Sequence, residues 1–321
     1  MKLATKLLFT LLLSSNAYAV TNGTSVNWND YQDMVEMDCT GTVIAGKFIL
    51  TAAHCTNDNN IRFSDNTMVS SVARVDHLNW DTPDTGVDVS LWTLPSSRSS
   101  EQIHYFANLT NDISVQDQKL KLFGFGSTNN ADNPLHYATV NAHINTDKSP
   151  HIINGQFINQ GQGIEGDSGG AWLNVNNEIV AVVKSGYGDT TFGTNLFYAK
   201  NFILENINGW HYPTLANTSN GSTTIKVQSL HDPLSGQVND MAYTSGEATI
   251  TGGTCFQASG IQPFSTCTYI VESQGTGTLH LSDSESITIK PTPESGGGDS
   301  GGSLGFLSLI GLLGLGLIRK K

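Results

Sequence analysis

Two short segments carry the residue types that nucleophilic catalysis requires. Segment 51–55 reads TAAHC after an apolar run, and segment 166–170 reads GDSGG in a glycine-rich loop. A serine hydroxyl is a poor nucleophile near neutral pH and needs a base within hydrogen-bond reach, for which an imidazole has a suitable pKa. A carboxylate must orient that imidazole, and backbone amides must stabilise the oxyanion that forms. Glycines around the serine allow the tight turn that points amides at this oxyanion.

The two segments together indicate one enzyme family. GDSGG alone has the composition of an ordinary turn, and a lone histidine in an apolar run is more often buried than catalytic. Across residues 20–212, however, the chain resembles the trypsin/chymotrypsin family of serine endopeptidases. The resemblance implies that His54 is the general base and Ser168 the nucleophile. It also implies that the backbone amides of Gly166 and Ser168 form the oxyanion hole.

The same resemblance implies a third catalytic group, an aspartate at the start of an apolar strand between the two segments. Segment 87–91 reads VDVSL and matches this pattern, so we predict that Asp88 orients the base. Asp84 is the fallback, and Asp76 and Asp81 are weaker candidates. The alternative interpretation of each of them is a solvated loop acid.

Activation in this family depends on a freed amino terminus that folds inward and pairs with the aspartate before the nucleophile. Segment 20–23 reads VTNG and fits that role, with Asp167 as the partner. Signal peptidase cleavage after Ala19 would itself expose Val20, so no separate propeptide is needed. The alternative is that cleavage falls elsewhere and Val20 only begins the first strand.

Specificity is less well defined by the sequence. The residue six before the nucleophile lines the base of the family's S1 pocket, and here it is Gln162, followed by Gly163. Enzymes of the family that cut after Arg or Lys carry an aspartate at that position. Because a buried, unpaired cation is costly, strict Arg/Lys preference is disfavoured. We interpret Glu165 as a solvated loop carboxylate. The alternative is that it attracts basic groups at the rim of the pocket.

The pocket wall departs from the family pattern. The family usually has Ser-Trp-Gly where this chain has segment 183–186, VKSG. Gly186 would keep the pocket entrance open and offer its backbone to the substrate. Either Lys184 or Ser185 takes the position of the family's serine, depending on a shift of one residue.

Composition limits the other functions. The chain has 321 residues and a net charge of −12, which disfavours nucleic acid as a partner. Four cysteines fit two disulfides in an oxidising compartment. The resemblance pairs Cys39 with Cys55 around the base, and Cys255 and Cys267 lie close enough in sequence to staple a C-terminal unit.

Neither a metal nor another cofactor is predicted. Eight further histidines form no tight metal-ligand spacing with cysteines or acids. We expect them on the surface or in loops: His77, His104, His136, His143, His151, His211, His231 and His280.

The two ends of the chain have the composition of targeting segments. Residues 1–19 have a basic start, an apolar stretch and a small-residue cleavage site, as in a secretory signal. Residues 291–303 form a Gly/Ser/Pro linker, and residues 304–321 a short apolar stretch with a basic end. This tail resembles the GlyGly-CTERM tails of Gram-negative secreted proteins, which implies type II secretion and removal by a rhomboid-type protease. A plain C-terminal anchor that keeps a short transmembrane helix is the alternative.

Between these ends we predict an all-β protein. Residues 20–212 have short β-like runs, with one helical pattern over residues 198–207, and the family implies two six-stranded β-barrels. Residues 213–222 are predicted to be a linker, and residues 223–290 a small β-sandwich-like, immunoglobulin-like module. The module resembles those of Vibrio-type extracellular proteases in architecture only.

The prediction is therefore a secreted or cell-surface serine endopeptidase of a Gram-negative bacterium, acting on protein or peptide substrates. A catalytically inactive homologue used for surface binding is the first alternative. The second alternative is a surface adhesin whose main function is carried by residues 223–290.

Overall fold

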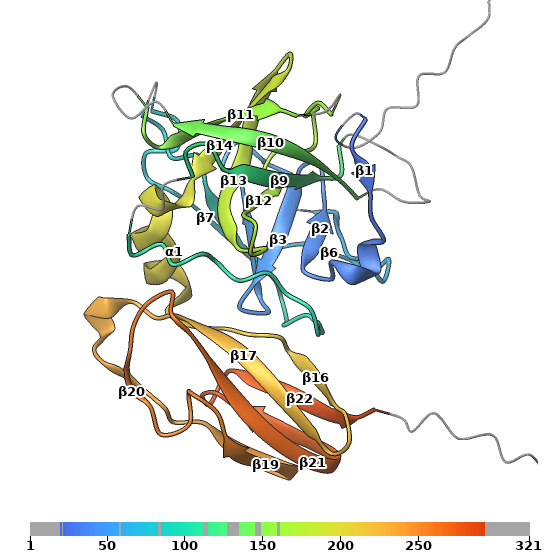
Figure 1. The fold of residues 1–321 in the computed structure, drawn as a ribbon, viewed down its shortest axis with the longest axis vertical. Helices are drawn as coiled ribbons and strands as arrows, with labels where there is room; N and C mark the ends of the chain where they lie inside the picture. Colours follow the sequence, from blue (N-terminus) through green and yellow to red (C-terminus); the bar gives the residue numbers. More distant parts are fainter. Residues whose placement is uncertain are drawn as a thin grey trace, which may run out of the picture.

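A computed structural model describes residues 20, 22–57, 59–82, 85–111, 115–126, 135–144, 149–158 and 161–292 (Figure 1). The predicted signal segment, the apolar tail, most of the Gly/Ser/Pro linker and the fallback Asp84 lie outside these residues. No helix of the described ranges is long and apolar enough to cross a membrane.

The N-terminal part of the chain forms a curled sheet of seven strands in the order β6-β5-β2-β3-β4-β8-β7. The two central strands are almost wholly buried, in keeping with their apolar sequences. A short helix, η1 (Trp28–Asp30), precedes the sheet. The strands are β2 (Met34–Glu36), β3 (Thr40–Ile44), β4 (Phe48–Thr51), β5 (Ile61–Arg62), β6 (Met68–Val69), β7 (Ala73–Asp76) and β8 (Ser90–Thr93).

The next part closes into a barrel of six strands, because β9 pairs with both β10 and β12. Trp172 fills its interior, and the bare backbones of Gly155 and Gly193 make room for the indole. A two-residue strand, β1 (Thr24–Ser25), extends the sheet beyond β10. The barrel strands are β9 (Lys119–Gly124), β10 (His136–Ile144), β11 (Ile152–Phe157), β12 (Ala171–Leu173), β13 (Ile179–Tyr187) and β14 (Thr190–Asn195).

The predicted helical pattern is confirmed, with a slightly different start. A 3-10 turn, η2 (Leu196–Ala199), leads into α1 (Lys200–Ile207). Asn208 ends the helix in the left-handed conformation with φ 41°, and its N–H bonds back to Leu204 O.

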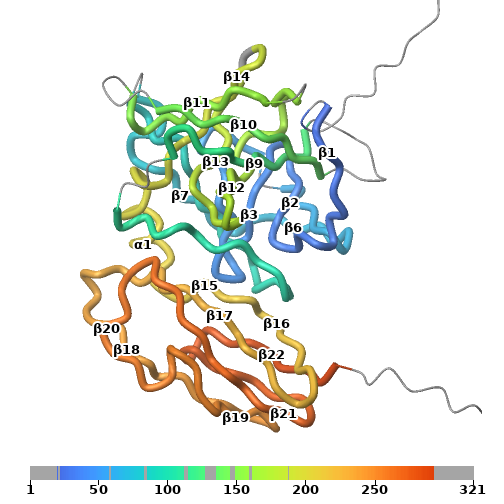
Figure 2. The backbone as a smooth tube through the Cα atoms, viewed as in Figure 1, coloured from blue at the N-terminus to red at the C-terminus, as the bar shows by residue number. Residues whose placement is uncertain are grey.

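The C-terminal part is one six-stranded sheet that curls around its own core (Figure 2). The long strand β21 pairs with β17, β19 and β22, and β22 pairs in parallel with β16. A separate pair joins β18 to β20. The elements are β15 (Gly209–His211), β16 (Leu215–Thr218), β17 (Ser222–Leu230), η3 (Pro233–Ser235), β18 (Val238–Asn239), β19 (Tyr243–Gly252), β20 (Ser259–Ile261), β21 (Thr266–His280) and β22 (Ser286–Pro291).

The predicted linker over residues 213–222 is not a linker in the structure. It contains the strand β16, which completes the C-terminal sheet through its parallel pairing with β22. β15, which we expected in the first unit, pairs with β17 of the second. The C-terminal sheet therefore begins directly after α1.

Buried polar contacts join this sheet to the rest of the chain. The Gln228 side chain is fully buried; its Oε1 accepts from Phe106 N–H at 3.0 Å and its Nε2 donates to Phe106 O at 2.8 Å. Leu230 and Phe264 of the C-terminal part belong to the same apolar cluster as Phe106. The two parts consequently share one core.

The all-β, chymotrypsin-like fold class is confirmed. Only one of the two expected barrels closes with six strands; the N-terminal sheet and the C-terminal sheet are curled half-barrels. Both disulfides are present, Cys39–Cys55 and Cys255–Cys267.

We predict that Gln228→Leu lowers the free energy of unfolding by about 2–4 kcal/mol, because it leaves the buried Phe106 N–H and the carbonyls of Phe106 and Phe264 without the bonds that Gln228 provides. Chemical denaturation followed by tryptophan fluorescence measures this loss. Gln237→Leu, at an exposed glutamine of the same unit, is the matched control and should change stability by less than about 0.5 kcal/mol. Equal effects of the two substitutions would contradict the role assigned to Gln228.

Candidate active site

One buried carboxylate holds His54 through two hydrogen bonds. Asp88 Oδ2 lies 2.7 Å from His54 Nδ1, and Asp88 Oδ1 accepts from the His54 backbone N–H at 3.0 Å. The pairing of β4 with β8, in which Thr51 faces Ser90, brings the two residues together. Because an ionised carboxylate can only accept, the His54 ring donates its Nδ1 N–H to Asp88.

The environment keeps Asp88 ionised. Its side chain is 4% exposed, and burial alone would raise its pKa. The hydrogen bonds and charge of His54, together with the charge of Lys184, outweigh burial and lower the pKa of Asp88 below its usual value. The side chain of His54 is 38% exposed, so the ring remains accessible from solvent.

Ser168 lies in a tight turn where the two sheets meet. Gly166 and Gly169 on either side have φ of 93° and 81°, the left-handed region that favours glycine. Ser168 O accepts from Thr40 N–H at 2.8 Å and lies 3.9 Å from the sulfur of Cys55, the neighbour of His54 in the chain. In the described part of the chain, no hydrogen bond is recorded for the Ser168 hydroxyl.

Asp167 is fully buried beside this turn. Its carboxylate accepts backbone N–H groups from Ile164 at 2.8 Å, Gly126 at 2.9 Å and Val20 at 3.4 Å. Burial raises the pKa of Asp167 to about 7, although the three hydrogen bonds act in the opposite direction. No cation is recorded against it in the described ranges, so the ionised form is poorly compensated.

Two of the residues expected at the substrate pocket, Gly163 and Gly186, lie near each other. A Cβ placed on Gly186 would lie 3.8 Å from Gly163 O, and one placed on Gly163 would lie 3.7 Å from Thr191 Oγ1. Thr191 is buried and was missed in the sequence, since nothing local distinguishes it from other threonines. Gln162 and Glu165 are exposed.

Of the two residues left open on the pocket wall, Lys184 reaches the site. Lys184 Nζ lies 3.8 Å from Asp88 Oδ2, whereas Ser185 uses its carbonyl to accept from Thr191 Oγ1. A register shift in the pairing of β13 with β14, between Val183 and Ser185, accounts for this placement.

Arg74 also holds the backbone on both sides of His54, which the sequence did not predict. Arg74 on β7 donates to the carbonyls of Ala53 and Cys55, the two neighbours of His54. Its guanidinium also pairs with Asp76 at 2.7 Å, so this weaker candidate for the third group is engaged elsewhere. Asp81 is exposed.

The expectation that the other histidines lie on the surface or in loops is wrong for two of them. It fails for His136 and His211, which are buried within strands, whereas the buried His151 lies in a turn as the prediction allows. Burial lowers the pKa of His211 to about 4. His211 Nδ1 accepts from Ala45 N–H, and its Nε2 donates to His104 O. The cluster of Cys39, His54 and Cys55 holds no thiolate, because the two sulfurs are bonded to each other.

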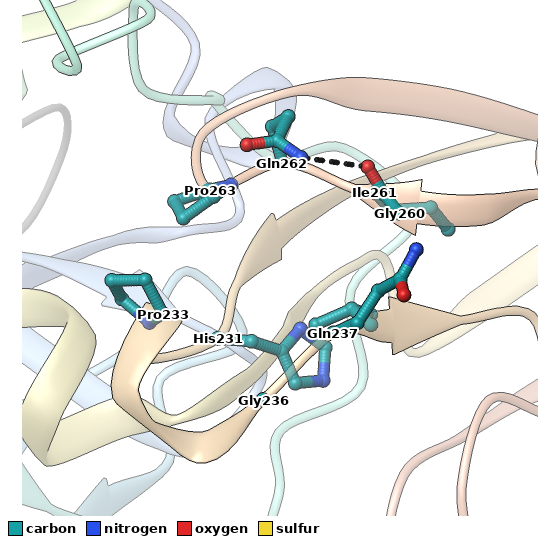
Figure 3. Close-up of a pocket in the computed structure, with 9 residues that line it drawn as sticks. His231, Pro233, Gly236, Gln237, Gly260, Ile261, Gln262 and Pro263 are labelled. Atoms are coloured by element: carbon teal, nitrogen blue, oxygen red, sulfur yellow. Dashed lines mark hydrogen bonds between the residues drawn. The ribbon is translucent and has the colours of Figure 1, made fainter.

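A cavity of about 350 Å³ in the C-terminal part is the other candidate site (Figure 3). None of its nine lining residues is charged at neutral pH, since burial lowers the pKa of His231 to about 4. Gln262 Nε2 is engaged by Gly260 O at 2.9 Å. The cavity therefore offers shape but little chemistry.

Comparison with known proteins identifies a family for the first part of the chain. The family model described as Trypsin matches residues 20–208. Among solved structures, HL collagenase is 20% identical with a TM-score of 0.47, covering 58% of this chain and 97% of that one. The VesB protease of Vibrio cholerae is 16% identical with a TM-score of 0.47, covering 85% of this chain and 99% of that one. No curated protein sequence matches.

We predict that Gly169→Ala costs about 1–3 kcal/mol more stability than Gly188→Ala. Both glycines have positive φ, so both substitutions incur similar backbone strain of about 1–2 kcal/mol. A Cβ at position 169 would also overlap Thr51 and Thr40, whereas nothing lies within 4 Å at position 188. Denaturant unfolding measures the difference, and equal losses would contradict the close packing of the serine turn against β3 and β4.

Proposed function

The chain belongs to the trypsin family, and on that premise we propose that it is a serine endopeptidase in which Ser168, His54 and Asp88 act together. The observation that supports this most is the double hydrogen bond from His54 to one buried carboxylate. It leaves Nε2 of the partly exposed His54 ring as the proposed base. His54 is next in sequence to Cys55, whose sulfur lies near Ser168.

In the proposed mechanism, Ser168 Oγ attacks the carbonyl carbon of the scissile peptide while His54 Nε2 accepts its proton. Asp88 stabilises the imidazolium that results. The backbone N–H groups of Gly166 and Ser168 donate to the oxyanion, an interaction worth roughly 10²–10³ in rate per donor. His54 then protonates the leaving amine, and water hydrolyses the acyl-enzyme by the reverse sequence.

The substrate class we propose is proteins or peptides with an uncharged residue before the scissile bond. Gln162 carries no charge, and the space between Gly163 and Gly186 is bordered by the hydroxyl of the buried Thr191. No described carboxylate is recorded there to balance a substrate cation, whose unpaired burial would be costly.

A fluorophosphonate probe tests the proposed nucleophile. We expect a covalent adduct on the peptide that contains Ser168, and none in Ser168→Ala. In Asp88→Asn the orientation of His54 is kept but its tautomer is wrong, so the rate of labelling should fall by about 10³–10⁴-fold. A folded protein that begins at Val20 and gives no adduct would support the inactive binding homologue instead.

Activation is proposed to follow cleavage after Ala19, which converts the amide of Val20 into an ammonium. In the uncut chain Val20 has φ 39°, an unfavourable conformation for a β-branched residue. Cleavage abolishes that dihedral, and the new cation lies against the poorly compensated carboxylate of Asp167. A charge-assisted hydrogen bond of this kind contributes about 1.5–3 kcal/mol.

We predict that a protein with extra residues before Val20 loses stability as the pH rises from about 4 to about 7. The folded pKa of Asp167, about 7 in the uncut chain, is raised above its unfolded value, so folding favours the protonated acid and is penalised once the acid ionises. Melting temperatures measured across this range should fall more in the extended protein than in one beginning at Val20. Adding Asp167→Asn to the extended protein should remove this difference, and its persistence would contradict the assignment.

The export route is also proposed from the sequence. Signal peptidase would release residues 1–19, type II secretion would export the protein, and a rhomboid-type protease would remove the GlyGly-CTERM-like tail. Intact mass and N-terminal sequencing of the secreted protein test each cut, and a first residue other than Val20 would refute the activation scheme.

A further inference from the structure

Asp88 has a cationic neighbour, Lys184, in addition to His54. Lys184 Nζ lies 3.8 Å from Asp88 Oδ2, the same oxygen that is 2.7 Å from His54 Nδ1. The family residue expected at this place on the pocket wall is an uncharged serine. We propose that Lys184 is a positioning residue whose ammonium shares Asp88 with His54 and thereby keeps His54 unprotonated to lower pH. This inference rests on the proposed endopeptidase function.

The fold directs Lys184 to this position. Val183 on β13 pairs with Gly193 of β14 and exchanges backbone hydrogen bonds with the serine turn, through Gly169 N–H and Gly170 O. Ser185 then pairs with Phe192, the next residue back along β14, so Lys184 is the extra residue of a bulge. Its side chain is 30% exposed and is anchored in a strand that also fixes the turn carrying Ser168.

The other charged groups nearby do not supply Lys184 with another carboxylate. His151, ahead of β11, is uncharged near neutral pH because burial and the charge of Lys184 lower its pKa. Arg74 on β7 already pairs with Asp76. From β14 only the Thr194 hydroxyl approaches, donating to Asp88 O at 3.4 Å. Among the described residues, Lys184 therefore forms its ion pair with Asp88.

The consequence is electrostatic. The nitrogens Lys184 Nζ and His54 Nδ1 are at most 6.5 Å apart, the sum of their distances to the shared oxygen. When His54 is protonated, two cations face one carboxylate, and their repulsion opposes protonation. Removing the charge of Lys184 should therefore make His54 easier to protonate.

Three variants test the proposal: Lys184→Met removes the charge at similar length, Lys184→Arg keeps the charge, and Lys119→Met removes an exposed lysine of β9 as the matched control. The rate of fluorophosphonate labelling is measured against pH. We expect the acid limb to move to higher pH in Lys184→Met, and to remain in place in the other two. A loss of rate that is uniform over pH would show a merely structural role and overturn the proposal.

A second measurement does not depend on activity. In the Ser168→Ala background, the titration of the His54 imidazole is followed by NMR with and without Lys184→Met. The midpoint should rise by the same amount, and an unchanged midpoint would overturn the proposal. If the wild-type protein is not labelled at all but this midpoint moves, the endopeptidase assignment fails while the pairing of Lys184 with Asp88 stands.

Discussion

The candidate site depends on one buried residue, Thr40, which binds the two catalytic halves to each other. Its N–H donates to Ser168 O at 2.8 Å and its hydroxyl donates to Gly166 O at 2.9 Å. The same hydroxyl accepts from Phe125 N–H, and Thr40 O accepts from the Thr51 hydroxyl at 2.9 Å. Because β3 and β4 lead to His54 while the turn that carries Ser168 belongs to the barrel, these bonds set His54 relative to Ser168. Both groups can therefore be preorganised without a direct bond between them.

Three buried acids hold together segments that are distant in sequence. Asp33 accepts from the backbone and ring of His104, Asp88 from the backbone and ring of His54, and Asp167 from three backbone amides. In the first two cases an imidazole supplies the countercharge when it is protonated, and for His104 the charge of Asp33 outweighs burial, so its pKa is raised. Among the residues that the structure describes, Asp167 has no such partner in the uncut chain. It is the one of the three whose proposed partner is a new amino terminus.

Short-range patterns predicted the elements closest to the chemistry. TAAHC and GDSGG each place a reactive side chain through backbone turns encoded within a few residues, and the spacing of the cysteines permits closure of small loops. The short apolar runs also predicted a β-rich chain, and the family resemblance implied the barrels. Their closure does not follow, because it depends on β9 meeting both β10 and β12, and the register of such long-range pairs is not written locally.

The errors have the same origin. Residues 213–222 have the composition of a linker, but a parallel partner more than seventy residues away turns part of them into a strand. Lys184 and Ser185 were indistinguishable until the bulge in β13 placed one of them at Asp88. Tertiary contacts override local composition in each case.

His211 links the first part of the chain to the C-terminal sheet. Both of its ring nitrogens bind backbone groups of the first part, Ala45 N–H and His104 O, and burial keeps it neutral with the proton on Nε2. Its own strand pairs with the C-terminal sheet. Removing that sheet would leave the two backbone groups without partners and expose the apolar cluster to which Leu230 and Phe264 contribute. The C-terminal sheet therefore helps to stabilise the part of the chain that carries His54 and Ser168.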